Sequence, residues 1–460
     1  MIRSIDEADN IFFIGVAGTG MSALAQYLSW SGKKVSGSDR YFIENEENEI
    51  RQKLQTAGIE CFLQNGEGIK NNTGLVIVST AVEDSVPEVQ KAKTLNIPIL
   101  KRAELLALIA ESKKTIAIGG TSGKSTTTAM LFNILEFAGV DPGIISGAGL
   151  VTIIKEGKIG NAKVGTSDWL VIEADESDGS IIQYHPEIGV LLNVDKDHKE
   201  VDVLMEIFNI FKNNSKQFVV NASHPLAKTL STQTQNNFGI DNDDDATFIS
   251  RGFKQNGLTI SFEINGVEFN LNQVGKHSME NALAAATVAH LIGVDLQTSA
   301  RALQSYEGIY RRHQVIGKKN GVLLVDDYAH NPVKCAVSIR ACQPLAPKLI
   351  AWLQPHGYGP TRFLRNDFVK EISSVLREGD EIWMSEIFYA GGTTTKDISA
   401  NDLVKDIQAL GKNAFFVEDR EKLTEAVLPH LTENCVLLLM GARDPSLEKF
   451  AQDVLHKLPG

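Results

Sequence analysis

A run of glycines followed by a lysine and a serine lies in residues 115–130, which read TIAIGGTSGKSTTTAM. In such a loop, backbone N–H groups and a helix N-terminus bind phosphate oxygens, the lysine neutralises charge, and the serine hydroxyl can bind Mg²⁺. The spacing Gly-x-x-Gly-Lys-Ser is shorter than the common form, so the prediction depends on the apolar run before it and the helical run after it. A glycine-rich turn with a surface lysine is the alternative. The flanking elements favour an ATP site at Gly120, Thr121, Ser122, Gly123, Lys124, Ser125 and Thr126.

A second glycine loop, GVAGTG at residues 15–20, lies near the N-terminus between an apolar run and a helical stretch. Glycines allow close approach to a diphosphate, and an acidic residue about twenty positions later can bind a ribose hydroxyl. Ser38 and Asp39 follow the next predicted strand. The order GxxGxG differs from the common GxGxxG, so a nicotinamide site and a turn without ligand both stay open beside a nucleotide-diphosphate site.

Acidic side chains follow two predicted buried strands of the central region. Residues 173–178 read EADESD, and Asp195, Asp197 and His198 follow the apolar run 189–193. Ligands bind at the carboxyl ends of parallel strands, where hard oxygen ligands suit Mg²⁺ and a histidine can bind a second ion. Solvated loop charges are the alternative for any single acid.

Further polar residues surround a predicted strand at residues 322–325. Asp327, Tyr328, His330 and Asn331 follow it, and the pair Arg311-Arg312 precedes it. A lone histidine after a strand is more often structural, and an arginine pair is more often exposed. These residues are therefore weaker candidates when considered alone.

Composition is that of an ordinary globular protein with several domains. The chain has 460 residues, 43% hydrophobic and 22% charged, with a net charge of −12. This charge disfavours nucleic acids and anionic membranes as partners. Cys61, Cys335, Cys342 and Cys435 lack metal-site spacing and read as reduced thiols. With neither a signal peptide nor a membrane span recognisable, we expect a cytoplasmic protein without membrane insertion.

Short apolar runs alternate with helical stretches along most of the chain, which predicts βαβ units and an α/β fold. The alternating run 259–264, Asn265-Gly266 and the run 267–271 predict a hairpin. We expect three domains, at residues 1–110, 111–305 and 306–460: a Rossmann-like N-terminal domain, a central ATP-binding domain of P-loop type with a small antiparallel insertion, and a C-terminal domain.

The chain contains, in this order, the motifs GVAGTGMSALA, VSGSD, STAV, RAEL, GTSGKSTTT, EADESD, LNVDKDH, GKHSMENALAAA, RRHQ, DDYAHNP, QPHGY and LLLMGARD. Together these motifs resemble the Mur ligase family of ATP-dependent amide-forming ligases, which make peptidoglycan precursors. The likeness covers nearly the whole chain and is greatest to the branch that adds L-alanine to UDP-N-acetylmuramate. It implies a Rossmann-like C-terminal domain that receives the amino acid, and activation of the substrate carboxylate as an acyl phosphate.

The resemblance also assigns roles to particular residues. Lys124, Arg312, Asp327 and His330 would be catalytic, while Ser125, Glu173 and His198 would bind magnesium. His277 and Asn281, in an HxxxN pattern, would join the phosphate loop, Arg312 and Asp327 around ATP; a packing helix is the alternative for this segment. The UDP-sugar site would comprise Gly15, Gly18, Thr19, Gly20, Met21, Ser38 and Asp39.

One motif departs from the alanine-adding branch. There the QPH motif continues with arginine, tyrosine, threonine and arginine, whereas here Gly357 and Pro360 occupy the two arginine positions and Arg362 lies two residues on. Arginines suit carboxylate recognition, so the joined amine stays open. The alternative amines are another amino acid or a recycled murein peptide. A separate alternative is that the protein is a nucleotide-binding paralogue without transfer chemistry.

Overall fold

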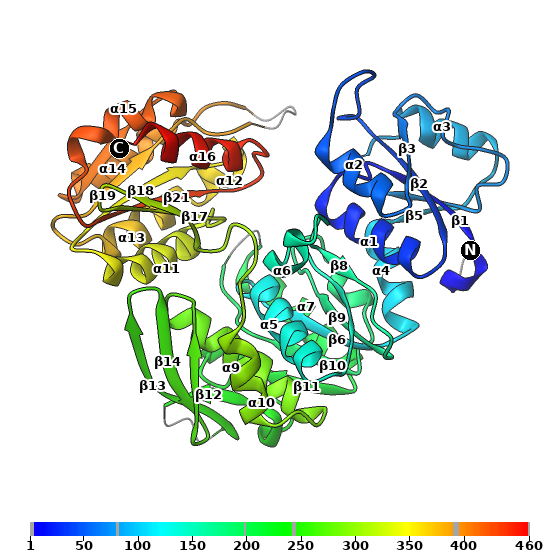
Figure 1. The fold of residues 1–460 in the computed structure, drawn as a ribbon, viewed down its shortest axis with the longest axis horizontal. Helices are drawn as coiled ribbons and strands as arrows, with labels where there is room; N and C mark the ends of the chain where they lie inside the picture. Colours follow the sequence, from blue (N-terminus) through cyan, green and yellow to red (C-terminus); the bar gives the residue numbers. More distant parts are fainter. Residues whose placement is uncertain (1–3, 80–81, 197–198, 242–244, 390–394, 459–460) are drawn as a thin grey trace. The chain divides into compact units, whose positions relative to one another are not determined.

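The computed structural model describes residues 4–79, 82–196, 199–241, 245–389 and 395–458. The chain forms two compact units. One comprises Met1–Arg251, Glu263–Phe269 and Glu280–Ile309, and the other Gly252–Phe262, Asn270–Met279 and Tyr310–Gly460. The described residues contain four sheets (Figure 1). Short 3-10 helices cover Ile5–Glu7, Ser180–Gln183, Thr234–Asn236, Gln343–Leu345, Arg420–Lys422 and Leu428–His430.

The N-terminal sheet is parallel and has the strand order β3-β2-β1-β4-β5. This order reverses between β1 and β4, and ligands bind at such a reversal in open α/β sheets. The glycine loop follows β1, so it lies at this point. The strands are β1 (Asn10–Ile14), β2 (Lys34–Asp39), β3 (Glu60–Leu63), β4 (Leu75–Val78) and β5 (Ile99–Lys101), and the helices are α1 (Thr19–Trp30), α2 (Glu49–Thr56), α3 (Pro87–Thr94) and α4 (Arg102–Glu111).

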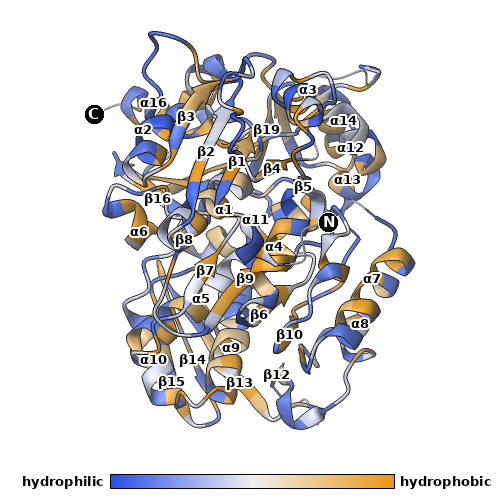
Figure 2. Ribbon diagram, turned by 90° about the vertical axis from the view of Figure 1, so that its right-hand side faces the viewer, coloured by the Kyte–Doolittle hydropathy of each residue, from blue (hydrophilic) through white to orange (hydrophobic). Residues whose placement is uncertain are grey.

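The central sheet has the order β11-β10-β6-β9-β7-β8 and is parallel except for β8. Because β6 lies between β9 and β10, the loops after these three strands meet at one edge. Hydrophobic colour marks β9 and β10 in Figure 2, as expected for buried parallel strands. The elements are β6 (Lys114–Gly119), α5 (Lys124–Phe137), β7 (Gly143–Ile145), α6 (Val151–Lys155), β8 (Ala162–Lys163), β9 (Trp169–Glu173), β10 (Ile188–Leu191), α7 (Val201–Asn214), β11 (Gln217–Val220) and α8 (Pro225–Lys228).

A small sheet contains the hairpin predicted from Asn265-Gly266. Both residues have positive φ angles, 45° and 85°, as a two-residue hairpin turn requires. Two further strands, β12 and β13, were not predicted, and they pair in parallel. The elements of this region are β12 (Phe238–Ile240), β13 (Phe248–Asn256), β14 (Thr259–Ile264), β15 (Val267–Leu271), α9 (Lys276–Leu291) and α10 (Leu296–Gln304).

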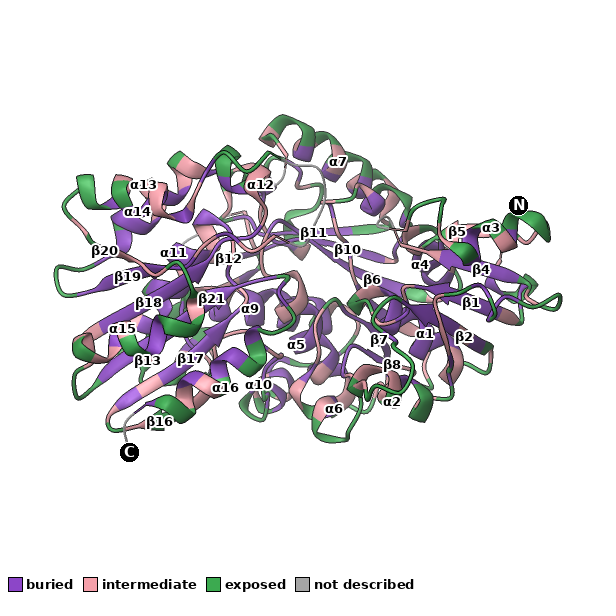
Figure 3. Ribbon diagram, turned by 90° about the horizontal axis from the view of Figure 1, so that it is seen from above, coloured by how far each residue is buried: buried purple, intermediate pink, exposed green. Residues whose placement is uncertain are grey.

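The C-terminal sheet has the order β16-β17-β21-β18-β19-β20, and its edge strand β16 is antiparallel to β17. Central strands β18 and β21 are almost wholly purple in Figure 3, the colour of buried residues. The strands are β16 (Gln314–Lys319), β17 (Val322–Asp327), β18 (Lys348–Gln354), β19 (Glu381–Met384), β20 (Asn413–Phe416) and β21 (Cys435–Gly441). The helices are α11 (Pro332–Cys342), α12 (Tyr358–Phe363), α13 (Arg365–Val375), α14 (Ala400–Ala409), α15 (Leu423–Val427) and α16 (Leu447–Lys457).

The cysteines Cys61, Cys335, Cys342 and Cys435 are free and buried, in agreement with the prediction of reduced thiols. In the described part of the chain, no helix combines the length and the apolar character needed to cross a membrane.

Candidate active site

The phosphate loop joins β6 to α5 and has a backbone that two glycines make possible. Gly120 and Gly123 have φ angles of 135° and 84°. A Cβ atom at Gly120 would lie 3.1 Å from Leu192 Cβ, and one at Gly123 would lie 2.4 Å from Asn281 Oδ1. The backbone angle therefore disfavours larger residues at both positions, and at Gly123 a Cβ would also clash with Asn281.

Asn193, which follows β10, holds the phosphate loop in place. Its Oδ1 accepts hydrogen bonds from Thr121 Oγ1 at 2.9 Å and Ser122 N at 2.8 Å, and its Nδ2 donates to Ser122 O at 3.1 Å. Asn193 was not among the predicted site residues. Its position as a polar residue at the very end of the predicted buried run 189–193 is the signal that could have identified it.

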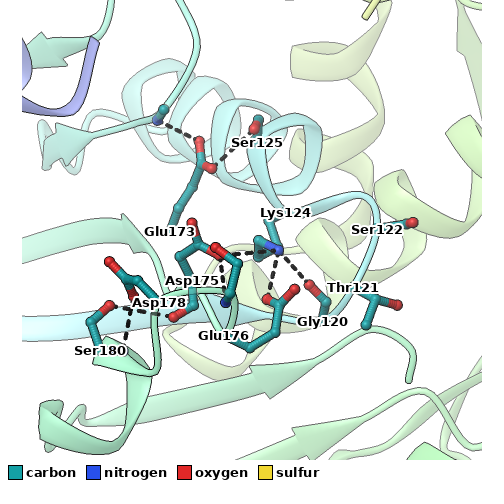
Figure 4. A network of polar contacts seen from close by, with 12 residues as sticks. Gly120, Thr121, Ser122, Lys124, Ser125, Glu173, Asp175, Glu176, Asp178 and Ser180 are labelled. Carbon is teal, nitrogen blue, oxygen red and sulfur yellow. Dashed lines mark hydrogen bonds and ion pairs between the residues drawn. The ribbon is translucent and has the colours of Figure 1, made fainter. Parts of the chain in front are cut away.

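Lys124, the first residue of α5, makes a partly buried ion pair (Figure 4). Its Nζ donates to Gly120 O and to Glu176 Oε2, both at 2.7 Å, and lies 3.9 Å from Asp175 Oδ1. Burial opposes the charge on Lys124, but the surrounding carboxylates, Glu176 foremost, outweigh burial and raise its pKa. Burial in turn raises the pKa of Glu176. Glu176 is therefore a partner of the phosphate-binding lysine, a role that the EADESD motif alone did not predict.

Glu173 and Ser125, two predicted magnesium ligands, are in direct contact. Ser125 Oγ donates to Glu173 Oε2 at 3.0 Å, while Glu173 Oε1 accepts from Ser146 Oγ and Gly147 N, both at 2.7 Å. Adjacent ligands of an octahedral Mg²⁺ ion lie about 3 Å apart, so the spacing of the two oxygens fits this ion. When bound, Mg²⁺ would neutralise phosphate charge.

The third predicted magnesium ligand, His198, lies outside the described residues. Within the described ranges, no three His, Cys, Asp or Glu residues gather in a way that could hold a metal. Few protein ligands are needed where phosphates and water complete the shell of Mg²⁺. Magnesium binding here stays a prediction.

Replacing Glu173 with glutamine tests this magnesium site. The amide keeps the side-chain shape but removes the charge, so the Mg²⁺ concentration for half-maximal activity should rise by about 10- to 100-fold. A magnesium titration of activity at saturating ATP measures this change. An unchanged titration curve would contradict the assignment of Glu173 as a ligand.

The N-terminal glycine loop is held by β2. Gly15 N and Val16 N both donate to Ser38 O, and Ala17 N donates to Asp39 Oδ2 at 2.9 Å. The other Asp39 oxygen accepts from Tyr41 N at 3.0 Å. Asp39 thus shapes the loop backbone itself, a role that the sequence had not predicted beside the proposed contact with ribose.

The remaining predicted residues of this site lie around the same loop. Ser38 Oγ is buried, with no hydrogen-bond partner in the described chain, and a ligand could satisfy such an atom. Gly18 is the N-cap of α1, and Thr19, Gly20 and Met21 form its first turn. A Cβ at Gly20 would lie 3.0 Å from Arg102 Cδ, so a larger residue there would require the Arg102 side chain to shift.

In the second unit, Asp327 at the end of β17 belongs to a buried polar cluster. Its Oδ2 accepts from Ser338 Oγ at 2.6 Å and lies 3.4 Å from His313 Nε2. The pKa of Asp327 is lowered, because His313, Arg312 and Ser338 together outweigh its burial. The cluster therefore keeps Asp327 negatively charged.

The two residues of the HxxxN pattern on α9 have different surroundings. The His277 ring lies 5.0 Å from the His313 ring, and burial lowers the pKa of His277 to about 3. His277 is therefore neutral at ordinary pH. Asn281 instead accepts from Thr127 Oγ1 at 3.2 Å, beside the phosphate loop. Asn281 has the surroundings expected of a nucleotide-site residue, and the nucleotide contact of His277 stays a prediction.

The neighbouring residues Arg311 and Arg312 have different partners. Arg311 donates to Asp326 at 2.8 and 3.2 Å and to Gly441 O at 3.0 Å, and it is buried. The Arg312 guanidinium lies 4.7 Å from the centre of the Tyr328 ring. Arg311 and His313, on either side of Arg312, both have positive φ angles, which cost energy for non-glycine residues. Arg311 thus has a structural role, and Arg312 is the candidate for phosphate contact.

His330 follows the same strand. Its Nδ1 lies 2.8 Å from Tyr328 O, and its ring lies 5.2 Å from the ring of His356 in the QPH motif. The described structure therefore brings the DDYAHNP and QPH motifs together at the carboxyl ends of β17 and β18. The catalytic role of His330 stays a prediction.

The backbone conformation at Gly357 disfavours the arginine that the alanine-adding branch has at this position of the QPH motif. Gly357 has φ 73° and ψ 123°, a conformation that an arginine would adopt only under strain. Pro360 lies within the short helix α12. Arg362 is engaged by Thr395 O and by the Asp397 carboxylate, so its charge is already paired.

A phosphate loop with a partly buried lysine, an oxygen pair whose spacing fits Mg²⁺ and a glycine loop at a strand-order reversal define an α/β enzyme that uses a nucleoside triphosphate. Three family descriptions match the chain in order: "Mur ligase family, catalytic domain" at residues 10–114, "Mur ligase middle domain" at 118–289 and "Mur ligase, glutamate ligase domain" at 311–443. The chain belongs to the Mur ligase family. It is an ATP-dependent amide ligase of peptidoglycan synthesis, and the predicted three-domain α/β fold class is confirmed.

Individual proteins resemble the chain over nearly its full length. The UDP-N-acetylmuramate–L-alanine ligase of Carboxydothermus hydrogenoformans is 33% identical, with 96% of this chain and 95% of that protein covered. The ligase of the same name from Syntrophomonas wolfei is 32% identical, with 98% and 97% covered. The crystal structure of the Thermotoga maritima UDP-N-acetylmuramate-alanine ligase matches with a TM-score of 0.78 at 25% identity, covering 97% of this chain and 98% of that one. A murein peptide ligase from Psychrobacter arcticus shares the fold, with a TM-score of 0.68 at 20% identity and coverage of 97% and 98%.

Proposed function

We propose that this enzyme joins L-alanine to the carboxylate of UDP-N-acetylmuramate, with ATP as the second substrate and Mg²⁺ bound at Ser125 and Glu173. The observation that carries the proposal is the near-full-length likeness to UDP-N-acetylmuramate–L-alanine ligases, 33% in one case. The reaction would occur in the cytoplasm. The domain boundaries at residues 110 and 305 also stay predictions.

The first chemical step converts a poor electrophile into a reactive one. A carboxylate oxygen of UDP-N-acetylmuramate attacks the γ-phosphorus of ATP, the bond to the bridging β-oxygen breaks, and ADP leaves. Charge then spreads over the transferring oxygens. We place Lys124 and Arg312 at these oxygens, where fixed positive charge lowers the barrier to phosphoryl transfer.

The second step forms the amide bond. The neutral amine of the amino acid attacks the carbonyl carbon of the acyl phosphate, and the tetrahedral intermediate expels inorganic phosphate. Asp327 and His330 are proposed to lie where the nucleotide and the amine meet. Exclusion of water at this stage protects the acyl phosphate from hydrolysis.

A larger or different amine is the second candidate, because Gly357 and Pro360 remove two side chains that suit carboxylate recognition. The backbone at Gly357 also disfavours arginine, and Arg362 is paired with Asp397. A recycled murein peptide has no free carboxylate beside its amine, so its binding would not require arginines at these two positions.

A phosphate-release assay distinguishes these amines. The enzyme, ATP and UDP-N-acetylmuramate are incubated with L-alanine, glycine, L-serine or the recycled murein tripeptide, and the product mass is measured. We expect amine-dependent phosphate release, with kcat/KM highest for L-alanine. Preference for the tripeptide would select the second candidate, and no amide product with any amine would contradict both.

A further inference from the structure

Asn161 lies between α6 and β8 and is completely buried. Its Nδ2 donates to Thr19 O at 2.8 Å and to Ser22 Oγ at 3.0 Å, and its Oδ1 accepts from Gln26 Nε2 at 2.8 Å. Gln26 Nε2 also donates to Ser22 O, which fixes the orientation of both amides. The Asn161 side chain thus binds the start of α1, the helix that begins in the glycine loop.

The Asn161 backbone binds Ser146, which connects it to the magnesium-site residue Glu173. Its carbonyl oxygen accepts from Ser146 N at 2.9 Å. Ser146 Oγ in turn donates to Glu173 Oε1 at 2.7 Å, and Glu173 Oε2 accepts from Ser125 Oγ. Figure 4 shows Glu173 directed toward Ser125. A continuous series of hydrogen bonds therefore connects Thr19 to Ser125, and all its members lie in the first compact unit.

Separating the residues of this hydrogen-bond series requires a large free energy because they are buried. Asn161, Ser22, Gln26 and Ser146 are each no more than 2% exposed. The free-energy penalty of leaving a buried polar group without a partner exceeds the net contribution of a single hydrogen bond. The bonded residues of such a network therefore tend to move together. A ligand that shifts the first turn of α1 would displace Asn161 and, through its carbonyl, the loop that orients Glu173.

We infer that Asn161 is a positioning residue that couples occupancy of the glycine loop by the UDP-sugar acid to the placement of the magnesium ligand Glu173. The inference rests on the proposed function, which assigns the two ligands to these two places. Coupling is reciprocal, so Mg²⁺-bound nucleotide should tighten UDP-sugar binding by the same factor as the UDP-sugar tightens nucleotide binding.

Calorimetry tests this inference with UDP-N-acetylmuramate and the magnesium complex of a non-hydrolysable ATP analogue. Each Kd is measured alone and with the other ligand saturating. The wild-type enzyme should show a coupling factor of about 5- to 150-fold. For Asn161→Ala the factor should fall to about one, while UDP-N-acetylmuramate alone still binds within about threefold of wild type.

Two further variants separate coupling from general damage. Ser146→Ala removes the hydroxyl that joins the series to Glu173 and leaves the bond from Gly147 N, so it should reduce the coupling factor. The double variant should lose no more coupling than Asn161→Ala alone. Asn237→Ala is the matched control, because Asn237 is equally buried in the same unit and hydrogen bonds to Ser231 Oγ outside the series. Its coupling factor should equal that of wild type, even where its thermal stability falls.

The outcomes distinguish the inference from the proposed function. Coupling that persists in both Asn161→Ala and Ser146→Ala would overturn the inference, as would an equal loss in Asn237→Ala. A wild-type enzyme that binds both ligands without coupling would also overturn it and leave the proposed function standing. If wild type does not bind UDP-N-acetylmuramate at all, the proposed function and the inference both fail. Should Asn161→Ala not fold, Ser146→Ala alone decides the matter.

Discussion

Replacing Lys124 with alanine should lower kcat by about 10³-fold, because it removes a fixed positive charge from the transferring phosphoryl group. The wild-type ammonium is held between Gly120 O and Glu176, and the neighbouring carboxylates raise its pKa, so it stays charged throughout the working pH range. Binding of UDP-N-acetylmuramate should be unaffected. Phosphate release and calorimetry measure the two effects.

The same substitution leaves Glu176 buried without its cation, which is destabilising. The double variant Lys124→Ala/Glu176→Gln removes this unpaired charge, so its thermal unfolding midpoint should recover toward that of wild type. Its activity should stay as low as that of the single variant. Recovery of activity together with stability would show that Lys124 acts through folding and would contradict its catalytic role.

The adjacent arginines should respond in opposite ways to alanine substitution. Arg312→Ala should lower kcat by about 10³-fold, the loss typical of an arginine that stabilises a transferring phosphoryl group, while the unfolding midpoint changes little. Arg311→Ala should cost about 3–5 kcal/mol of stability, because it leaves Asp326, 2% exposed, buried without its partner. Turnover and thermal unfolding are measured for both variants.

Lysine substitutions sharpen this comparison. Arg312→Lys keeps the charge and should recover part of the lost activity, whereas Arg311→Lys cannot reproduce the two bonds to Asp326 and the bond to Gly441 O. Full activity in Arg312→Ala, or unchanged stability in Arg311→Ala, would reverse the two assigned roles.

The sequence predicted the loops well because their chemistry is local. Gly120 and Gly123 are required by the φ angles of a turn between one strand and one helix, and Asn265-Gly266 by a two-residue hairpin. Strand β16 was missed because its residues are half exposed at an edge, where the apolar pattern is weak. Strand β12, three residues long, gave too short a pattern to be recognised.

The sequence by itself determined the order of phosphate loop, carboxylates and C-terminal motifs, and through it the family. Tertiary structure alone decided that Glu176 pairs with Lys124, that Asn193 holds the phosphate loop, and that Arg311 is structural while Arg312 is not. The physical reason is that these pairings depend on which strand ends are neighbours in a sheet. Because β6 lies between β9 and β10, residues more than forty positions apart meet at one edge, and no local pattern records that adjacency.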